Sequence, residues 1–435
     1  MKRILKAIFV TILTSLYIFP FETIWLPSIN TKMALAAFAP IIFVINGARM
    51  RNAQISKRLF ILSIFALFVS FMGLISVIIN NTHDYSYATY FVSMWVWLGG
   101  AYVVIQIMNF MYGKVNIRMI GNFLVAVAVI QCILSQIIHT NEVFANFVDS
   151  FMISTGFMGK PENRLYGIGC ALDVAGIKFS TILIIIAFFS ISRKFNGGKD
   201  HVQYIYMLAY IIVAILGSMI ARTTSVGIIL SILLWIILYF YYPNKSREHA
   251  SIVRTIKTFC VFIIVLLPSV IYLYHANDDF YSNVRFGFKG FFSLVEKGKW
   301  EVQSNNQMLS MVVWPNNLKT WFIGDGYFEN PMKDFYYLGP EYNYYLGTDV
   351  GYCRFIFYFG LLGLLVFSLF FIVSAYICSI NNPQYAIMFW FFLFINFIVW
   401  VKVSSDIFPI FALFLCVAEF ENEKYKILQS SESVK

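Results

Sequence analysis

Long apolar runs separated by short polar segments dominate the chain, and many are long enough to cross a bilayer. A hydrocarbon core of about 30 Å takes about 20 residues of α-helix. The pattern predicts an all-α polytopic membrane protein with about twelve transmembrane helices. The expected spans are 4–20, 32–47, 59–80, 89–111, 119–138, 176–192, 204–221, 225–242, 258–274, 351–378, 384–401 and 407–420.

Charges in the connecting segments predict the orientation of these helices. Lysine and arginine concentrate in the segments 48–58, 113–118, 193–203 and 243–257. Basic loops stay preferentially in the cytoplasm. Both termini are therefore expected in the cytoplasm, and most aspartate and glutamate residues then fall on the outer side.

The same topology predicts how the chain is divided. The expected parts are residues 1–274 with nine helices and an outer loop at 139–175, a large outer loop at 275–350, the last three helices within 351–420, and a cytoplasmic tail at 421–435. The large loop holds several tryptophans and helix-like stretches such as 285–297, so we expect it to fold over the membrane as a lid. Because loops on a rigid scaffold usually carry function, the site is expected on the outer face.

Composition supports the membrane class and excludes others. The chain is 60% hydrophobic, 19% aromatic and only 12% charged, whereas soluble domains carry about 25% charged residues. The net charge of +10 comes from short loops and not from a patch on a folded domain, so no nucleic-acid partner is expected. The six cysteines and five histidines show no metal-binding spacing, and we expect neither a metal nor another cofactor.

Arg222 stands in a tight turn at 222–224, between two apolar helices with almost no loop around it. A charge held close to a membrane is costly and usually functional. Arginine binds phosphate oxygens through parallel hydrogen bonds and keeps its charge at working pH. We therefore expect Arg222 to bind a lipid diphosphate. The alternative is that its side chain only reaches the headgroups and anchors the helical hairpin.

Two further arginines and one carboxylate are candidates on the same outer face. Arg164 and Arg285 would add positive charge, although each could be an ordinary solvated side chain. A carboxylate could act as general base towards an acceptor hydroxyl. Asp349 is favoured because it stands where the large loop returns to the membrane, shortly before Arg354. Simple solvation is expected for the loop's other carboxylates, Asp278, Asp279, Asp325 and Glu341.

With these features the chain resembles the O-antigen polymerase and ligase superfamily, over roughly 120–420. The shared features are about twelve helices, a large outer loop before the last helices, and outer arginines. The matching pieces are Arg164-Leu-Tyr-Gly167, a short arginine turn at Ser218–Thr223, and Arg285 followed by the segment Trp321–Phe328, which contains the turn Gly324-Asp-Gly326.

The chain departs from the motif of the ligase branch of that superfamily. The ligase branch typically carries a histidine and a polar residue, then nine residues, then a Gly-x-x-Gly end. Here Asp349-Val350 precedes Gly360-Leu-Leu-Gly363 in that frame, so the histidine is missing. The resemblance therefore favours the polymerase branch, in which a segment like Thr348–Tyr352 is at home.

The resemblance implies a polymerase of the bacterial inner membrane, with a fold like that of C-type glycosyltransferases and an active site facing the periplasm. Such an enzyme joins undecaprenyl-diphosphate-linked repeat units into O-antigen, capsule or exopolysaccharide, with undecaprenyl diphosphate as leaving group. The implied partners are these lipid-linked glycans, membrane lipids and a polysaccharide chain-length regulator. Neither a nucleotide sugar nor a metal ion is required.

The same resemblance suggests roles for the candidate residues. Arg222 and Arg285 would stabilise the charge that develops on the leaving diphosphate. Asp349 would polarise the acceptor hydroxyl or orient an arginine. Substrate-binding roles are expected for Arg164, Arg354, Tyr352, Tyr327 and Trp321, the aromatic rings by stacking on sugars.

Three other functions remain open. An O-antigen ligase would transfer the glycan to lipid A core, and a histidine at position 349 would have supported it. A lipid-linked oligosaccharide flippase would show charges in the middle of its helices, whereas here the ionisable residues crowd at the outer ends. A glycosyltransferase that uses polyprenyl-phosphate sugars would have an acidic site in its first outer loop, where Glu22 is the candidate.

Overall fold

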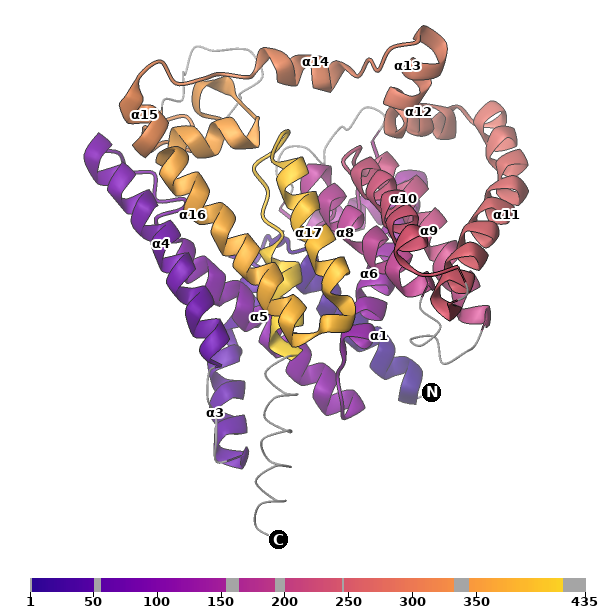
Figure 1. Ribbon diagram of the computed structural model, residues 1–435, viewed down its shortest axis with the longest axis horizontal. Coiled ribbons are helices and arrows are strands. Elements are labelled where there is room, and N and C mark those ends of the chain that lie inside the picture. Colours follow the sequence, from indigo (N-terminus) through magenta and orange to yellow (C-terminus); the bar gives the residue numbers. More distant parts are fainter. Residues whose placement is uncertain are drawn as a thin grey trace. The chain divides into compact units, whose positions relative to one another are not determined.

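A computed structural model describes residues 2–50, 56–153, 164–191, 200–244, 246–331 and 344–417, and these residues are almost entirely helical (Figure 1). The expected all-α membrane class is confirmed. Eight of the described helices are long and apolar enough to cross a membrane. They are α4 (Lys57–Asn80), α5 (Tyr90–Tyr112), α6 (Ile117–Thr140), α8 (Leu172–Ile191), α9 (Asp200–Ile220), α10 (Thr224–Tyr241), α11 (Arg247–Ala276) and α16 (Gly351–Asn381).

Shorter helices occupy the four remaining predicted spans. They are α1 (Lys2–Ile18), the pair α2 (Thr31–Ala37) and α3 (Ala39–Met50), α17 (Ala386–Val399) preceded by the 3-10 turn η2 (Pro383–Tyr385), and a helix at Phe408–Val417. The span expected at 32–47 is broken at Phe38 because Pro40 lacks an N–H and its ring clashes with the carbonyl four residues earlier. The predicted tail lies outside the described residues.

Shorter elements lie in the segments that connect the long helices. A two-stranded antiparallel hairpin, β1 (Glu22–Thr23) and β2 (Leu26–Asn30), follows α1. The loop at 139–175 contains α7 (Glu142–Phe151). The segment 275–350 contains α12 (Asp278–Gly287), α13 (Lys289–Lys297), α14 (Gln303–Ser310), α15 (Leu318–Ile323) and the 3-10 turn η1 (Tyr345–Gly347). The stretch 285–297, expected to be helical, lies in α12 and α13.

The chain forms two compact units. The first comprises Met1–Leu35 and Val104–Trp300, and the second comprises Ala36–Val103 and Glu301–Lys435. The large predicted loop thus contributes α12 and α13 to the first unit and α14 and α15 to the second. Of the eight site candidates, Arg164, Arg222 and Arg285 lie in the first unit, and the other five lie in the second unit: Trp321, Tyr327, Asp349, Tyr352 and Arg354.

In the first unit, α8 is the central helix and packs against α6, α9 and α10 (Figure 1). Its membrane-spanning part is almost completely buried. Helix α11 differs, because its buried residues, His249, Ser251, Ile252 and Thr255, all lie in its first half. An apolar helix that is exposed on most sides is typical of a lipid-facing span.

In the second unit, α4 runs along α16, and α15 packs across α16 (Figure 1). Helix α16 is bent at Phe359 and Gly360, where the backbone leaves the helical region and Gly360 adopts φ 69°. The bend frees the carbonyls of Phe357 and Tyr358, which accept hydrogen bonds from the N–H groups of Asp325 (2.6 Å) and Gly326 (3.2 Å). The segment after α15 is thereby fixed against α16.

Candidate functional site

The tight turn that carries Arg222 is confirmed and is held from both sides. Helix α9 ends at Ile220 and α10 begins at Thr224. The N–H of Ala221 donates to the carbonyl of Gly217 (2.8 Å). From α8, the buried hydroxyl of Ser180 donates to the carbonyl of Thr223 (2.8 Å). Because the turn is tied to two helices, the backbone position of Arg222 is fixed.

Arg164 is brought to the same end of α9 by the loop that precedes α8. The N–H of Leu165 donates to the carbonyl of Met219 (3.3 Å). The loop itself is clamped by the buried amide of Gln131, which accepts from the N–H of Ile168 (3.0 Å) and donates to its carbonyl (2.9 Å). Two arginines distant in sequence therefore meet at one helix end.

Phe286 is the common contact of the two arginines. The guanidinium carbon of Arg222 lies 4.3 Å from the ring centroid, and that of Arg164 lies 4.9 Å from it. Helix α12 can approach α9 this closely because of Gly287, where a Cβ would lie 2.9 Å from the carbonyl oxygen of Ser218. Each cation–π contact is worth about 0.5–2 kcal/mol, so the ring holds two like charges near each other.

Asp173 supplies negative charge to this cluster. It lies in the first turn of α8 and accepts a hydrogen bond from the hydroxyl of Thr223. Leu172, directly before it, adopts φ 58°, a conformation that is uncommon for leucine and often marks functional sites. The local backbone therefore carries strain where the carboxylate enters the cluster.

Among the described residues, the cluster joins two guanidinium groups and one carboxylate in a partly buried setting. Burial lowers the pKa of Arg164 and of Arg222, and for Arg222 the neighbouring positive charge of Arg164 lowers the pKa further. The carboxylate of Asp173 opposes both shifts. Arginine still keeps its charge at working pH. Two guanidinium groups against one carboxylate form a place where an anion would be stabilised.

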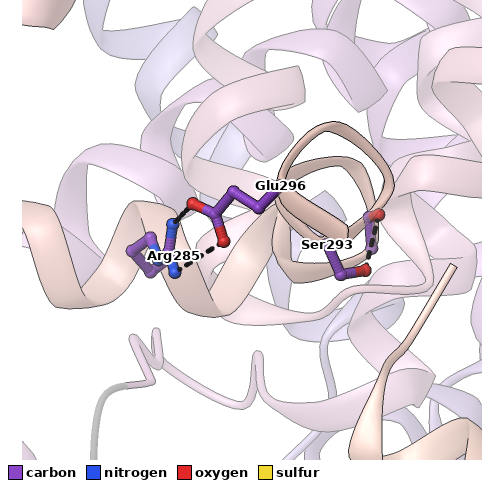
Figure 2. A network of polar contacts seen from close by, with 4 residues as sticks. Arg285, Ser293 and Glu296 are labelled. Carbon is purple, nitrogen blue, oxygen red and sulfur yellow. Dashed lines mark hydrogen bonds and ion pairs between the residues drawn. The ribbon is translucent and has the colours of Figure 1, made fainter. Parts of the chain in front are cut away.

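Arg285 contacts a different partner, as Figure 2 shows. Its two terminal nitrogens donate to the two carboxylate oxygens of Glu296, the second over 3.2 Å, and its guanidinium lies 4.8 Å from the ring of Phe292. Hydrogen bonding raises the pKa of Arg285 and lowers the pKa of Glu296. Since consecutive helix positions face different directions, Arg285 does not follow Phe286 towards Arg222. It links α12 to α13 instead.

The Glu296→Gln variant is expected to keep nearly full stability and activity. Both side chains of this ion pair are partly exposed, and such pairs contribute little to stability because water screens them. The thermal unfolding temperature and the specific activity of the purified variant would check this. A loss of activity without a loss of stability would mean that Arg285 acts directly on a substrate and needs Glu296 to do so.

In the second unit, Arg354 is buried at the start of α16 and is only 7% exposed. Its terminal nitrogens donate to the hydroxyl of Ser404 (2.8 Å) and to the carbonyl of Phe328 (3.1 Å). Its guanidinium carbon lies 3.6 Å from the ring centroid of Phe328 and 4.3 Å from that of Tyr344. The negative charge of Asp349 acts on it. These contacts connect the segment between α15 and α16 to the start of α16.

Asp325 was expected to be merely solvated, and this expectation is wrong. Its carboxylate accepts hydrogen bonds from the hydroxyls of Thr320 (2.6 Å) and Tyr345 (3.3 Å). The ring of Tyr345 stacks on that of Tyr327 at 5.3 Å. Burial, followed by the charge of Asp325, raises the pKa of Tyr345 to about 12. Gly324 and Gly326, at the two ends of the turn, both adopt positive φ, which glycine tolerates without steric cost.

The Tyr345→Phe variant tests whether this hydroxyl acts as a neutral donor. A tyrosine whose folded pKa is raised keeps its proton, and its stabilising effect is complete below the unfolded value of about 10 and is lost only as pH rises towards 12. The ratio of wild-type to variant activity is therefore expected to be constant between about pH 6 and pH 9. A ratio that falls through this window would show that the phenolate forms earlier.

The other aromatic candidates also lie in the second unit. Trp321 stacks on Trp314 at 5.7 Å, and Trp314 is 56% exposed. The hydroxyl of Tyr352 donates to the carbonyl of Phe397 (2.9 Å), so this side chain holds the last helices together. The two stacked pairs, Trp314–Trp321 and Tyr327–Tyr345, both lie in the segment between α14 and α16.

The structure therefore brings together Arg164 and Arg222, and it places Asp349, Arg354, Tyr352, Tyr327 and Trp321 in the other unit. Sequence reasoning missed Phe286 and Asp173. It also missed Lys178, a buried lysine in α8 whose ammonium lies 5.1 Å from the ring centroid of Phe19. A single acid at the start of an apolar span and a single lysine inside it were the available signals.

No protein-family model, no curated protein and no solved structure matches this chain. The resemblance to O-antigen polymerases therefore stays a prediction based on the arginine motifs and the loop order. Within the described residues, no group of three or more His, Cys, Asp or Glu side chains could hold a metal ion.

Proposed function

We propose that the protein is a glycosyltransferase that polymerises lipid-diphosphate-linked oligosaccharides at the outer surface of the bacterial inner membrane. The observation that carries the proposal is the pair of partly buried guanidinium groups at Phe286, with Asp173 as their carboxylate neighbour. The pair lies at the end of α9, a helix long and apolar enough to span a membrane. A diphosphate attached to a membrane lipid is the anion that such a position suits best.

The reaction would exchange one glycosidic bond for another. The acceptor hydroxyl oxygen bonds to the anomeric carbon of the donor sugar, the bond from that carbon to the diphosphate oxygen breaks, and the diphosphate leaves with the bonding electrons. The acceptor proton passes to a base. Arg164 and Arg222 would stabilise the negative charge on the leaving oxygen. Stabilising charge that develops in the transition state is usually the largest single contribution to an enzyme's rate enhancement.

Within the second unit, aromatic and carboxylate side chains are suited to bind a glycan. Its stacked rings, Tyr327–Tyr345 and Trp314–Trp321, present aromatic faces for sugar rings. Asp325, held by Thr320 and Tyr345, and Asp349 supply carboxylates that could orient or deprotonate a hydroxyl. On this proposal Arg354 positions the acceptor segment, because its guanidinium is enclosed by Phe328 and Tyr344.

An in vitro reaction tests the proposal. The purified protein in lipid nanodiscs receives the lipid-linked repeat unit of its own organism, and the products are separated by gel electrophoresis. A ladder of products, formed without nucleotide sugar and with chelator present, would support a polymerase. Transfer that requires lipid A core would identify a ligase. Movement of the intact lipid-linked glycan across the bilayer, with no new glycosidic bond, would identify a flippase.

The orientation of the chain belongs to the same proposal. Both termini would lie in the cytoplasm, and the turn at Arg222 would face the periplasm, because the basic connecting segments favour the cytoplasmic side. The polymer class and the expected chain-length regulator depend on the genome in which the protein occurs. Co-purification of that regulator from native membranes would test the partner.

A further inference from the structure

The β1–β2 hairpin and helix α7 carry exposed apolar side chains that the proposed reaction does not use. At the hairpin tip, Trp25 is 75% exposed and Leu26 is 55% exposed. On α7, Val143 is 80% exposed and Phe147 is 62% exposed. Val143 and Phe147 are four residues apart and therefore lie on one helix face. We call these four residues, together with Ile24, the hairpin–α7 surface.

Hydrogen bonds join the hairpin and α7 into one structure. The N–H of Ile24 donates to the carbonyl of Phe151 (3.1 Å), and the N–H of Ile153 donates to the carbonyl of Glu22 (2.9 Å). Beneath them lies a small core of Ile138, Val148 and Met152. Because backbone bonds and a core hold both parts, the exposed side chains belong to a built surface and not to an independent loop.

The surface lies where two apolar helices end. The hairpin begins at Glu22, shortly after α1 ends at Ile18, and α7 begins at Glu142, directly after α6 ends at Thr140. The buried Gln131 of α6 donates to the hydroxyl of Ser15 in α1 (3.0 Å), so the two helices end on the same side. Helix α6 has 24 residues and is about 36 Å long, which exceeds a hydrocarbon core of about 30 Å. Its end therefore reaches headgroup level.

The same surface continues a lipid-facing stripe. On α6, Ile130, Ile133 and Ile137 are exposed at helical spacing, as expected of a span that faces acyl chains. The chain then turns at Asn141, whose side chain caps α7 by accepting from the N–H of Phe144 (3.0 Å). Val143 and Phe147 follow directly. Tryptophan, as at position 25, is enriched at membrane interfaces because its ring is amphipathic.

We infer that the hairpin–α7 surface inserts into the boundary between headgroups and acyl chains of the outer leaflet, and that its partner is the bilayer itself. Tyr166 and Ile168, which follow Arg164 in the clamped loop, pack against the core beneath this surface. The inserted surface therefore sets the depth at which Arg164 stands relative to the lipid headgroups. This inference concerns membrane contact and holds whether or not the protein is a polymerase.

Spin labels measure the insertion directly. Labels are placed at Trp25→Cys and Phe147→Cys in full-length protein that carries Cys260→Ser, since Cys260 is the exposed one of the six cysteines. The protein is reconstituted in nanodiscs of phosphatidylethanolamine and phosphatidylglycerol. Collision with oxygen, which concentrates in lipid, is compared with collision with a water-soluble nickel complex. Ile133→Cys serves as the lipid-facing control, and the exposed, charged Glu142→Cys at the start of α7 serves as the water-facing control.

The expected result is that labels at positions 25 and 147 favour oxygen over nickel, at a shallower depth than position 133, while position 142 favours nickel. Val143→Cys repeats the measurement without altering the hairpin. Nickel-favoured collisions at positions 25, 143 and 147 would overturn the inference, because the surface would then face water. Immobilised labels that neither reagent reaches would also overturn it, because a protein, such as a second copy of the chain, would then cover the surface.

Discussion

The Arg222→Ala variant is expected to lower the rate of polymer formation about 10²–10³-fold, the usual cost of removing one fixed donor to a developing negative charge. Arg222 is the stronger candidate of the pair because its guanidinium lies closer to Phe286 and its turn is tied to two helices. The initial rate of ladder formation, at saturating lipid-linked substrate, is the measurement. Retention of more than about half of the wild-type rate would contradict the assignment.

The Arg222→Lys variant separates charge from geometry. Lysine keeps the positive charge but loses the planar fork that binds two oxygens at once and stacks on a ring. The lysine variant is therefore expected to be closer in rate to alanine than to the wild type. Equal activity of Arg222→Lys and wild type would mean that only net charge matters at this position.

Arg285→Ala provides the matched control. Arg285 lies next to Phe286 in α12, but its guanidinium is paired with Glu296. Removing it deletes an arginine next to Phe286 in sequence without touching the Arg164–Arg222 pair. A modest effect on rate is expected. An effect as large as that of Arg222→Ala, in a variant that unfolds at the wild-type temperature, would restore Arg285 to the diphosphate role that the sequence suggested.

The sequence could predict Arg222 because local features were enough. Two apolar spans with almost no residues between them leave a charge at the membrane surface, whatever the rest of the chain does. The orientation of Arg285 was not predictable in this way. Its partner Glu296 lies on the following helix, and only the bend between α12 and α13 determines that the two meet.

The roles of Phe286 and Asp173 also could not be predicted from the local sequence. Phe286 is one of 46 phenylalanines, and nothing in its surroundings in sequence marks it. It becomes distinctive only because Gly287 lets α12 approach the end of α9. Asp173 is an acid at a helix start, a common and favourable position, and only the hydrogen bond from Thr223 identifies its second role.

Hydropathy predicted the positions of the spans, whereas local chemistry changed the lengths of some of the helices. Each predicted span has a helix among the described residues, yet four of these helices have 17 or fewer residues or are interrupted. Pro40 interrupts the second, and a proline-led turn at Pro383 shortens α17. A window average records total hydrophobicity and does not detect where the helical hydrogen bonds stop.

The Gly360→Ala variant is expected to destabilise the protein by about 3 kcal/mol, through two effects that add. Gly360 has φ 69° and ψ −175°, a region that costs other residues about 1–3 kcal/mol, and an alanine Cβ would lie 2.2 Å from the backbone of Phe322. To relieve the clash, α15 must move away from α16. That movement would break the hydrogen bonds from Asp325 and Gly326 to the bend, so the carboxylate of Asp325 would lose its position as well.

Gly298→Ala is the control for a positive-φ glycine without a steric clash. Gly298 ends α13 with φ 67° and ψ 9°, the left-handed helical region, whereas Gly360 has ψ −175°, and a Cβ at Gly298 would have no atom within 4 Å. Its replacement is expected to cost only the conformational term, about 1 kcal/mol. The temperature at which half of the detergent-solubilised protein aggregates, measured for both variants, compares a positive-φ glycine with and without the close approach of α15. Equal losses in the two variants would mean that α15 does not pack against the bend in the folded protein, and that Asp325 must be held by some other contact.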